Sequence, residues 1–142
     1  LAGREAVASN SAYLMATGIP ALANVRTGFR TPQELKPVCA SAAVGISSAD
    51  YALAETGTLV MISSPEESRL ISLLPPAHVA VVPASRLLVN LDEVLTRIPR
   101  PGDKTSSMVL ITGPSRTADI EQILVRGVHG PGEIHVVLVE TE

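Results

Sequence analysis

The stretch TPQELKPVCASAAVGI, residues Thr31–Ile46, decides the fold class of this chain. Thr31 is a good helix N-cap, Pro32 suits the first helical position, and a Glu follows three residues after the cap. Apolar residues then recur at helical spacing, which predicts a helix over Pro32–Ser41. The apolar run Ala43–Ile46 follows at once and predicts a buried strand. A helix that leads directly into a buried strand is typical of an α/β fold.

Segments on both sides of this stretch continue the alternation. We expect helices over Leu1–Thr17, Leu91–Ile98 and Ala118–Arg126, and strands over Ala21–Val25, Tyr51–Ala54, Thr58–Ile62, His78–Val82, Met108–Ile111 and Ile134–Val139. The run Leu70–Leu74 fits a short helix and a strand equally well. Several strands are continuous β-branched runs, which is typical of strands buried on both faces. The sequence therefore predicts a mostly parallel mixed sheet flanked by helices, with local antiparallel pairing within residues 51–83.

The composition excludes several classes of protein. The 142 residues suit one domain, and 46% hydrophobic with 18% charged residues suits a folded core. Aromatic residues make up only 2% and the net charge is −3, so we expect neither a base-stacking platform nor a nucleic-acid surface. No apolar run approaches the roughly 20 residues of a membrane span. Because Cys39 is the single cysteine, we expect no disulfide, metal or iron–sulfur centre within this chain, and a cytoplasmic location.

The segment Gly113–Asp119, with the sequence GPSRTAD, follows an expected strand and opens an expected helix. Such a position lies at the carboxyl end of a strand, where α/β sheets usually bind ligands. Free helix amides, the Ser115 and Thr117 hydroxyls and the Arg116 guanidinium then form a candidate site for a phosphate or carboxylate. Asp119 favours the positive helix end but opposes an anion placed close to it. The alternative explanation is a well-capped helix with an exposed arginine.

The second candidate segment is Ala54–Thr58, with the sequence AETGT. Glu55 at a strand end, beside a glycine, suits a nucleophile, a general base or a partner for a substrate hydroxyl. The alternative is a hairpin turn in which Gly57 supplies a positive φ and Glu55 is solvated.

Isolated polar residues have structural explanations beside functional ones. His78, at the start of an expected strand, is suited to proton transfer near neutral pH or simply bonds a neighbouring backbone group. Cys39, on the apolar face of its helix, is expected in the core. His129 and His135 lack the spacing of a metal-binding pair. Asp50 either caps a backbone group or belongs to a site, and the sequence leaves both open.

Three separated segments resemble, in order and spacing, the signatures of one protein family. They are Gly45–Leu59, Ser72–Pro83 and Gly113–Glu121, the last followed by Gly127–Pro131. Together they span about residues 40–139 and resemble the LUD domain family, in particular its LutC/YkgG type, the lactate utilization protein C group.

This resemblance implies a NagB/RpiA/CoA-transferase-like α/β fold. It also implies an accessory subunit of a three-component system that oxidises L-lactate to pyruvate, in which other subunits hold the iron–sulfur centres. We therefore expect a chain without a cofactor or redox centre that binds a small anionic ligand or a partner, namely the iron–sulfur subunits, in a monomer or a homo-oligomer. Because family members are longer at the N-terminus, residues 1–142 are expected to be a single LUD domain that lacks its first strand and helix.

The resemblance also implies site residues, and by analogy with enzymes of the wider fold, in which a strand-end Glu acts on acyl or sugar substrates, Glu55 is the catalytic or ligand-contact candidate. Ligand contacts are expected from Thr56, Gly57, Thr58, His78, Gly113, Ser115, Arg116, Thr117 and Asp119. An alternative function is an acyl- or CoA-transferase-like or sugar-phosphate-handling enzyme, with Glu55 as nucleophile or base. A third is an interaction domain whose site has decayed. Convergence of Glu55, His78 and Arg116 in one cleft is the arrangement that supports a site.

Overall fold

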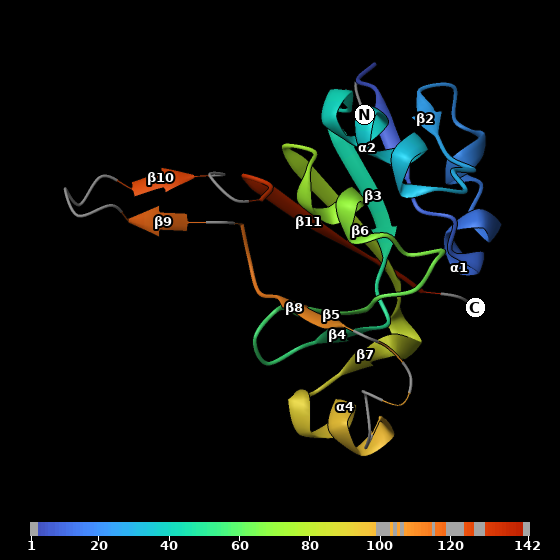
Figure 1. Cartoon of the computed structure of the whole chain (residues 1–142). Coiled ribbons are helices and arrows are strands. Elements are labelled where there is room, and N and C mark those ends of the chain that lie inside the picture. The colour runs from blue at the N-terminus through green and yellow to red at the C-terminus, as the bar shows by residue number, and fades with distance from the viewer. Residues whose placement is uncertain are drawn as a thin grey trace.

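The computed structural model describes residues 3–98, 103, 105, 107–114, 116–118, 124–126 and 130–140 (Figure 1). Its main sheet is parallel throughout, with the strand order β11-β6-β3-β1-β2. The strands are β1 (Ala6–Ala8), β2 (Val25–Arg26), β3 (Val44–Ser48), β6 (Ala77–Pro83) and β11 (Glu133–Val139). A second sheet has the order β7-β4-β5-β8 and consists of β4 (Tyr51–Leu53), β5 (Thr58–Ile62), β7 (Leu87–Leu88) and β8 (Met108–Ile111).

Helices connect the strands on both faces of the parallel sheet. They are α1 (Ala12–Ala16), α2 (Pro32–Ser41), α3 (Arg69–Leu73) and α4 (Leu91–Arg97), with short 3-10 turns η1 (Ile19–Ala21) and η2 (Ala84–Arg86). The connection from β1 to β2 contains α1, and the connections from β2 to β3 and from β3 to β6 contain α2 and α3.

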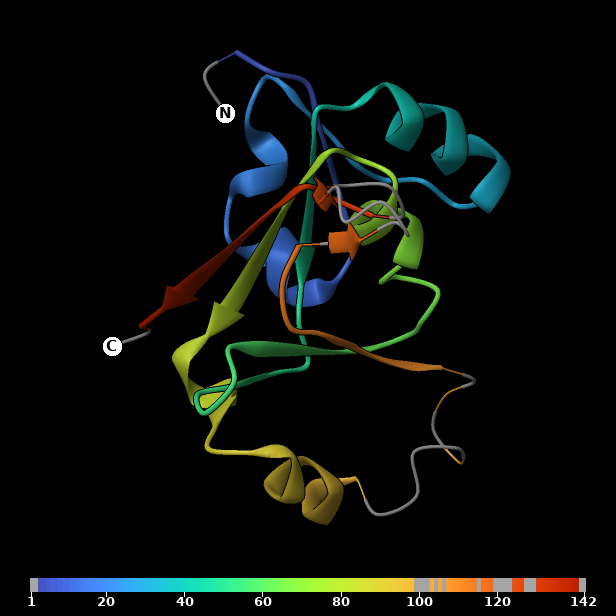
Figure 2. The same ribbon diagram turned by 90° about the vertical axis from the view of Figure 1, so that its left-hand side faces the viewer.

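Apolar contacts hold the helices and the second sheet against the parallel sheet. On one face of the parallel sheet, Ala8 and Ile46 pack together with Leu14 of α1. On the other face, Val7 packs with Leu35 of α2 and with α3. The second sheet packs one face against β6 and the other against α4, which lies at one end of the molecule (Figure 2). The parallel sheet is therefore covered by α1 on one side and by α2, α3 and the second sheet on the other.

The order of the parallel strands reverses between β1 and β3. The chain passes from β1 outward to β2, then returns across β1 to β3 and continues through β6 to β11. At such a reversal the loops after neighbouring strands leave toward opposite faces, which creates a crevice at the carboxyl ends of the strands. The residues that follow β1 and β3 are therefore the ones that the fold places for ligand binding.

Most predicted elements are confirmed. The helix α2 begins and ends at the predicted residues, and the strands predicted at β3, β4, β5, β6, β8 and β11 are present. The strands β4 and β5 are antiparallel neighbours, as expected. The undecided run Leu70–Leu74 contributes to α3, with Ser68 as the N-cap. The predicted α/β fold, with a mostly parallel sheet flanked by helices, is confirmed.

The prediction for the first segment, a helix over Leu1–Thr17, is wrong. It contains the strand β1, and α1 begins only at Ala12. The residues of β1 are fully buried between two other strands, so burial in the sheet outweighs the helix propensity of alanine. The strand predicted over Ala21–Val25 is also displaced, since β2 begins at Val25.

The helix predicted over Ala118–Arg126 is wrong as well. Two short strands, β9 (Arg116–Ala118) and β10 (Leu124–Arg126), pair there as an antiparallel ribbon that extends away from both sheets in Figure 1. Val125 lies opposite Thr117, and both residues are β-branched, which favours strands over helices.

Within the described residues, none of the helices has the length and apolar character that crossing a bilayer requires. The same residues contain no group of three or more His, Cys, Asp and Glu side chains arranged to hold a metal ion.

Candidate functional site

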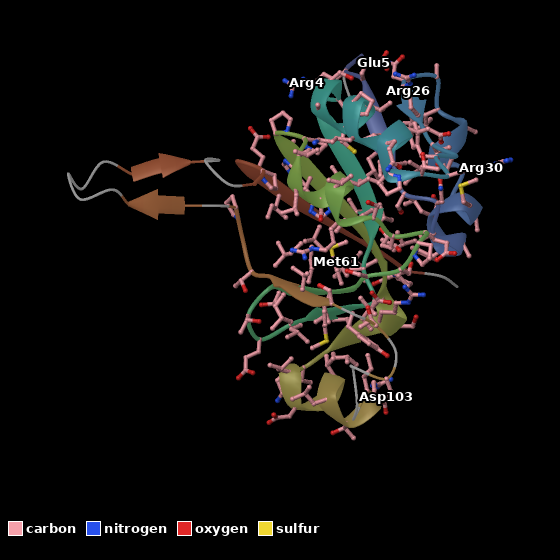
Figure 3. The ribbon with its side chains drawn as sticks, viewed as in Figure 1. Arg4, Glu5, Arg26, Arg30, Met61 and Asp103 are labelled. Atoms are coloured by element: carbon pink, nitrogen blue, oxygen red, sulfur yellow. The ribbon has the colours of Figure 1, made fainter. Side chains whose placement is uncertain are left out.

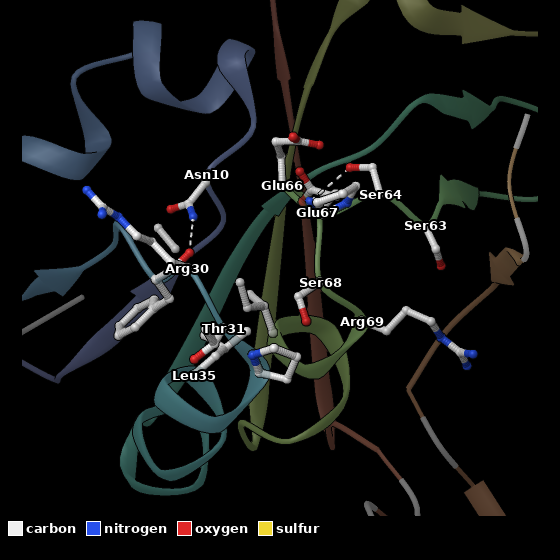
Figure 4. A pocket seen from close by; sticks show the side chains of 15 residues that line it. Asn10, Arg30, Thr31, Leu35, Ser63, Ser64, Glu66, Glu67, Ser68 and Arg69 are labelled. Carbon is white, nitrogen blue, oxygen red and sulfur yellow. Dashed lines mark hydrogen bonds between the residues drawn. The ribbon is translucent and has the colours of Figure 1, made fainter.

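A cleft of about 370 Å³ opens at the carboxyl end of β1, beside the first residues of α2 and α3 (Figure 4). Three segments line it: the end of β1, the loop that leads into α2, and the loop that leads into α3. The lining residues are Ala8, Asn10, Phe29, Arg30, Thr31, Pro32, Leu35, Ser63, Ser64, Pro65, Glu66, Glu67, Ser68, Arg69 and Ile71. The cleft therefore lies where the strand order reverses, at the position that α/β sheets use for ligands.

Asn10, two residues after β1, holds both walls of the cleft in place. Its Nδ2 donates a hydrogen bond to the Phe29 carbonyl (2.7 Å), and its Oδ1 accepts from the Gly28 amide (2.8 Å) and the Thr27 hydroxyl (3.1 Å). Its backbone amide donates to the Glu66 carbonyl on the opposite wall (3.0 Å). One side chain thus fixes the loop before α2, and one amide fixes the loop before α3.

A buried carboxylate, Glu67, lies among three serines at this cleft. Ser9 Oγ donates to Glu67 Oε2 (2.9 Å), and Ser48 donates to both carboxylate oxygens, through its amide (3.1 Å) and its hydroxyl (3.1 Å). Ser11 Oγ lies 2.9 Å from Ser48 Oγ and 3.4 Å from Ser9 Oγ. Only 8% of Glu67 is exposed. The cluster therefore joins the loop before α3 to the carboxyl ends of both β1 and β3.

The cluster changes the titration of Glu67. Burial in a poorly solvated site raises the pKa of Glu67 from 4.5 to about 6. The hydrogen bonds that Ser9 and Ser48 donate to the carboxylate, with the nearby Ser11 hydroxyl, act in the opposite direction, because they stabilise the ionised form. They offset only part of the effect of burial. A carboxyl group that titrates near physiological pH in a cleft is a candidate functional group.

The rim of the cleft carries charge and one of its walls is apolar. Arg30 and Arg69 are exposed on opposite sides, and in Figure 4 their guanidinium groups point away from each other. Phe29, Leu35 and Ile71 form the apolar wall. The cleft therefore combines a polar end, an apolar side and two cations at the entrance.

The predicted segment around Glu55 lies elsewhere, at the turn between β4 and β5. Glu55, Thr56 and Gly57 are exposed, and Gly57 has the positive φ (67°) that the turn explanation requires. Thr58 is buried, and its hydroxyl lies 2.7 Å from that of Thr56 and 3.1 Å from that of Thr112. The structure therefore brings Thr58 beside the residue that precedes Gly113, but none of these residues lines the cleft.

His78 is completely buried and lies outside the cleft. Its Nε2 is 2.8 Å from Ser47 Oγ, and its Nδ1 has no hydrogen-bond partner among the described residues. Desolvation lowers the pKa of His78 from 6.5 to about 4, so the imidazole is neutral at physiological pH. Glu55 at an exposed turn and His78 in the core do not converge on one site.

The anion site expected at Gly113–Asp119 rested on a helix N-terminus, and that part of the prediction is wrong. Arg116 and Thr117 belong to the strand β9, so these two described residues do not open a helix with free amides. Ser115 and Asp119 lie outside the described residues. Gly113 is exposed at the end of β8.

Asp50, which the sequence left open, and Cys39, which it placed in the core, both have structural roles. The Asp50 carboxylate accepts a hydrogen bond from the Ile62 amide (2.7 Å), so it caps a backbone group of β5, and burial raises the pKa of Asp50. Cys39 is a core residue as expected, and burial raises the pKa of its thiol to about 11.

Sequence reasoning missed Glu67 and the serines. A signal was present, because Ser9 and Ser48 follow or end buried strands at the carboxyl edge of the sheet, where the fold class places ligands. Glu67 itself belonged to a segment interpreted only as a helix start or a turn. Its burial comes from the three-dimensional packing of its loop against β1 and β3.

Comparisons with known proteins agree with the fold and show which family the chain belongs to. The family profile described as LUD domain matches residues 27–139. The protein named lactate utilization protein C of Exiguobacterium sp. (strain ATCC BAA-1283 / AT1b) is 40% identical over 112 residues, which covers 76% of this chain and 49% of that protein. The protein of the same name from Bacillus subtilis (strain 168) is 41% identical over 100 residues, which covers 68% of this chain and 42% of that protein.

A solved structure shows the same fold. It is the crystal structure of a DUF162 family protein from Deinococcus radiodurans, with a TM-score of 0.64 and 19% sequence identity, over 96% of this chain and 74% of that chain. The chain spans less than half the length of the lactate utilization proteins that it matches above.

Proposed function

The chain belongs to the LUD domain family, and from this premise we propose that it is the ligand-binding part of an accessory protein of lactate utilization, without a redox centre of its own. The relatives carry the name lactate utilization protein C, and this chain matches less than half of their length. The proposal therefore concerns what its own residues do, which is to hold a small anionic ligand in the cleft beside Glu67.

The observation that supports this function best is the Glu67 cluster at the point where the strand order reverses. Buried polar groups cost free energy unless each is hydrogen bonded, so cores normally avoid them. Here one carboxyl group, Glu67, lines the cleft, and three serines at the carboxyl ends of β1 and β3 are gathered behind it. A polar cluster in that place is better explained by a ligand than by packing.

The ligand that fits the cleft is a small carboxylate with a short apolar chain. A volume of about 370 Å³ lies at the lower end of the usual range for small-molecule sites. Arg30 and Arg69 supply positive charge at the entrance, and guanidinium groups are well suited to bind a carboxylate. The wall of Phe29, Leu35 and Ile71 suits the apolar part of the ligand. L-Lactate and pyruvate both have this chemistry.

The Arg30→Ala substitution is expected to weaken binding of L-lactate or pyruvate roughly tenfold, because it removes one charge-assisted hydrogen bond. Isothermal titration calorimetry with the sodium salts measures this change. Arg26→Ala is the matched control, since Arg26 is also exposed but lies close to Glu5 and apart from Arg30 in Figure 3, and outside the cleft. Equal weakening by both substitutions, or no binding of either acid by the unmodified chain, contradicts the proposal.

The proposed partners are iron–sulfur subunits of a lactate-oxidising system, as the name of the relatives and the resemblance of the motifs suggest. Co-purification of the full-length protein with such subunits from cells grown on lactate tests this part. Undiminished growth on lactate after deletion of its gene contradicts it.

A further inference from the structure

The hydroxyl groups around Glu67 have fewer protons than there are oxygen–oxygen contacts between them and the carboxyl group. The carboxyl oxygen Oε2 and the hydroxyls of Ser9, Ser11 and Ser48 form a ring with four oxygen–oxygen contacts. The contacts are Ser9–Glu67 at 2.9 Å, Ser9–Ser11 at 3.4 Å, Ser48–Ser11 at 2.9 Å and Ser48–Glu67 at 3.1 Å. Three of these distances are about 3 Å, the range of a hydroxyl hydrogen bond, whereas the Ser9–Ser11 contact is longer, and each hydrogen bond needs one proton.

Three hydroxyl groups bring three protons to these four contacts. Ser9 and Ser48 each face two acceptors, Glu67 and Ser11, but each carries a single proton to donate. The neighbouring amides do not help, because the Ser48 amide already donates to the other carboxyl oxygen, Oε1, and the Leu14 amide donates to Ser11 Oγ (3.3 Å). When Glu67 is ionised, the three protons supply the three short contacts, and the long Ser9–Ser11 contact is left without one.

A fourth proton, carried by Glu67 Oε2, supplies every contact in the ring. It also removes a negative charge from the cleft, and that charge opposes an anionic ligand. The pKa of Glu67, raised by burial to about 6 in the free chain, agrees with a carboxyl group that takes up this proton readily.

Three exposed charged groups share the cleft with Glu67: Arg30 from the loop before α2, Arg69 from α3 and Glu66 from the same loop as Glu67. The raised pKa of Glu67 comes from burial, partly offset by the serine hydrogen bonds, rather than from these charges. Asp50, which follows β3, is turned toward the Ile62 amide. A carboxylate ligand adds a further negative charge within the same cleft, so its arrival favours protonation of Glu67.

We propose that the cleft binds a small carboxylate together with one proton from solvent, and that Glu67 holds this proton within its ring of serines. This inference rests on the proposed function of the cleft and adds the ligand's proton requirement to it. No bond of the ligand forms or breaks, and the binding equilibrium takes up one ligand anion and one proton.

Calorimetric titration of the chain with sodium pyruvate and with sodium L-lactate, from about pH 5.5 to about pH 8, tests the proposal. The affinity is expected to fall by up to about tenfold for each pH unit above about 6, because the proton becomes scarcer. Repeating the titration near pH 7 in buffers of different ionisation enthalpy is expected to show uptake of close to one proton.

Two glutamine substitutions sharpen the test. Glu67→Gln carries a neutral amide at every pH, so its affinity is expected to be independent of pH over this range. Glu5→Gln is the matched control, because Glu5 is exposed and precedes β1, at the end of the strand opposite the cleft, and it should keep the pH dependence (Figure 3). A wild-type affinity that does not change with pH, or a pH dependence that survives in Glu67→Gln, overturns the inference while leaving carboxylate binding intact.

Failure of the proposed function looks different, since neither acid then binds at any pH. In that case the carbon-13 NMR titration of the Glu67 carboxyl in the free chain still decides whether the ring holds a proton. A midpoint near 6 supports the proton-holding role, and a midpoint near 4.5, the ordinary pKa of glutamate, overturns it.

Discussion

Replacement of Gly45 by alanine is expected to lower the free energy of unfolding by about 3 kcal/mol or more, which is at or beyond the upper end of the cost of overpacking a core. A Cβ atom at this position lies 1.9 Å from the Ile71 carbonyl oxygen and 3.1 Å from Pro75 Cγ. The first of these atoms belongs to the backbone of α3, so no rotamer change relieves the clash. The helix α3 must instead move away from β3, and this movement also displaces the loop that carries Glu67.

Urea denaturation followed by circular dichroism measures this loss. Gly132→Ala is a matched control, because its added Cβ also faces a carbonyl oxygen, that of Pro76, but at 4.0 Å, an ordinary contact distance. The control is expected to stay close to the unmodified chain in stability. Similar stability of the two alanine variants contradicts the close packing of α3 on β3.

The Glu67→Gln substitution is expected to stabilise the chain by about 2 kcal/mol at pH about 7 and to leave its stability almost unchanged at pH about 4. The pKa of Glu67 is higher in the folded chain (about 6) than its ordinary value (4.5), so folding favours the protonated carboxyl. The resulting stability is present below pH 4.5 and is lost as the pH rises through about 6. At about 1.4 kcal/mol per pKa unit, the loss is about 2 kcal/mol, which a neutral amide avoids.

His78 hides this dependence in the unmodified chain, because its effect has the opposite sign. The pKa of His78 falls from 6.5 to about 4 on folding, so its contribution is present above pH 6.5 and is lost as the pH falls through about 4. Between pH 4.5 and 6, the loss of stability from Glu67 and the gain of stability from His78 offset each other. In Glu67→Gln the His78 dependence is no longer offset by Glu67, and Asp50, whose pKa burial also raises, still opposes it. The stability of this variant should rise by up to about 3 kcal/mol from pH 4 to 6.5.

Urea denaturation of both proteins at several pH values checks this expectation, with Glu5→Gln as the control for the loss of an exposed carboxylate. A stability difference between wild type and Glu67→Gln that is the same at low and neutral pH contradicts the raised pKa of Glu67. A stability advantage of Glu67→Gln over wild type that is smaller at neutral pH than at low pH contradicts the raised pKa of Glu67 more strongly.

Local sequence signals were sufficient to predict most helices and strands, because each signal depends on residues within a single element. The cap at Thr31 and the proline after it define the start of α2, and the Thr31 hydroxyl accepts from the Glu34 amide (3.3 Å) as predicted. Likewise, Gly57 defines the turn between β4 and β5. The predictions fail where the secondary structure depends on residues distant in the sequence. The strand β1 is buried between β2 and β3, and β9 and β10 pair with each other.

The candidate site was harder to predict because it depends on residues far apart in the chain. Ser9, Ser48 and Glu67 come from three separate segments, and only the parallel pairing of β1 with β3 brings the first two together. Glu55 and His78 were better motif candidates by local pattern, but the fold places one at an exposed turn and buries the other. The spacing of residues along the chain does not predict whether a side chain is exposed at a turn or buried in the core.

The most direct test of the central claim is an amide NMR spectrum of the chain titrated with sodium pyruvate or sodium L-lactate. If the cleft at the carboxyl end of β1 is the binding site, the largest shifts should occur at Asn10 and Glu67, which line it, and at Ser9 and Ser48, which donate hydrogen bonds to Glu67. Shifts concentrated instead at Glu55–Thr58 and Gly113, with the cleft residues unchanged, would contradict the account and return the site to the turn between β4 and β5.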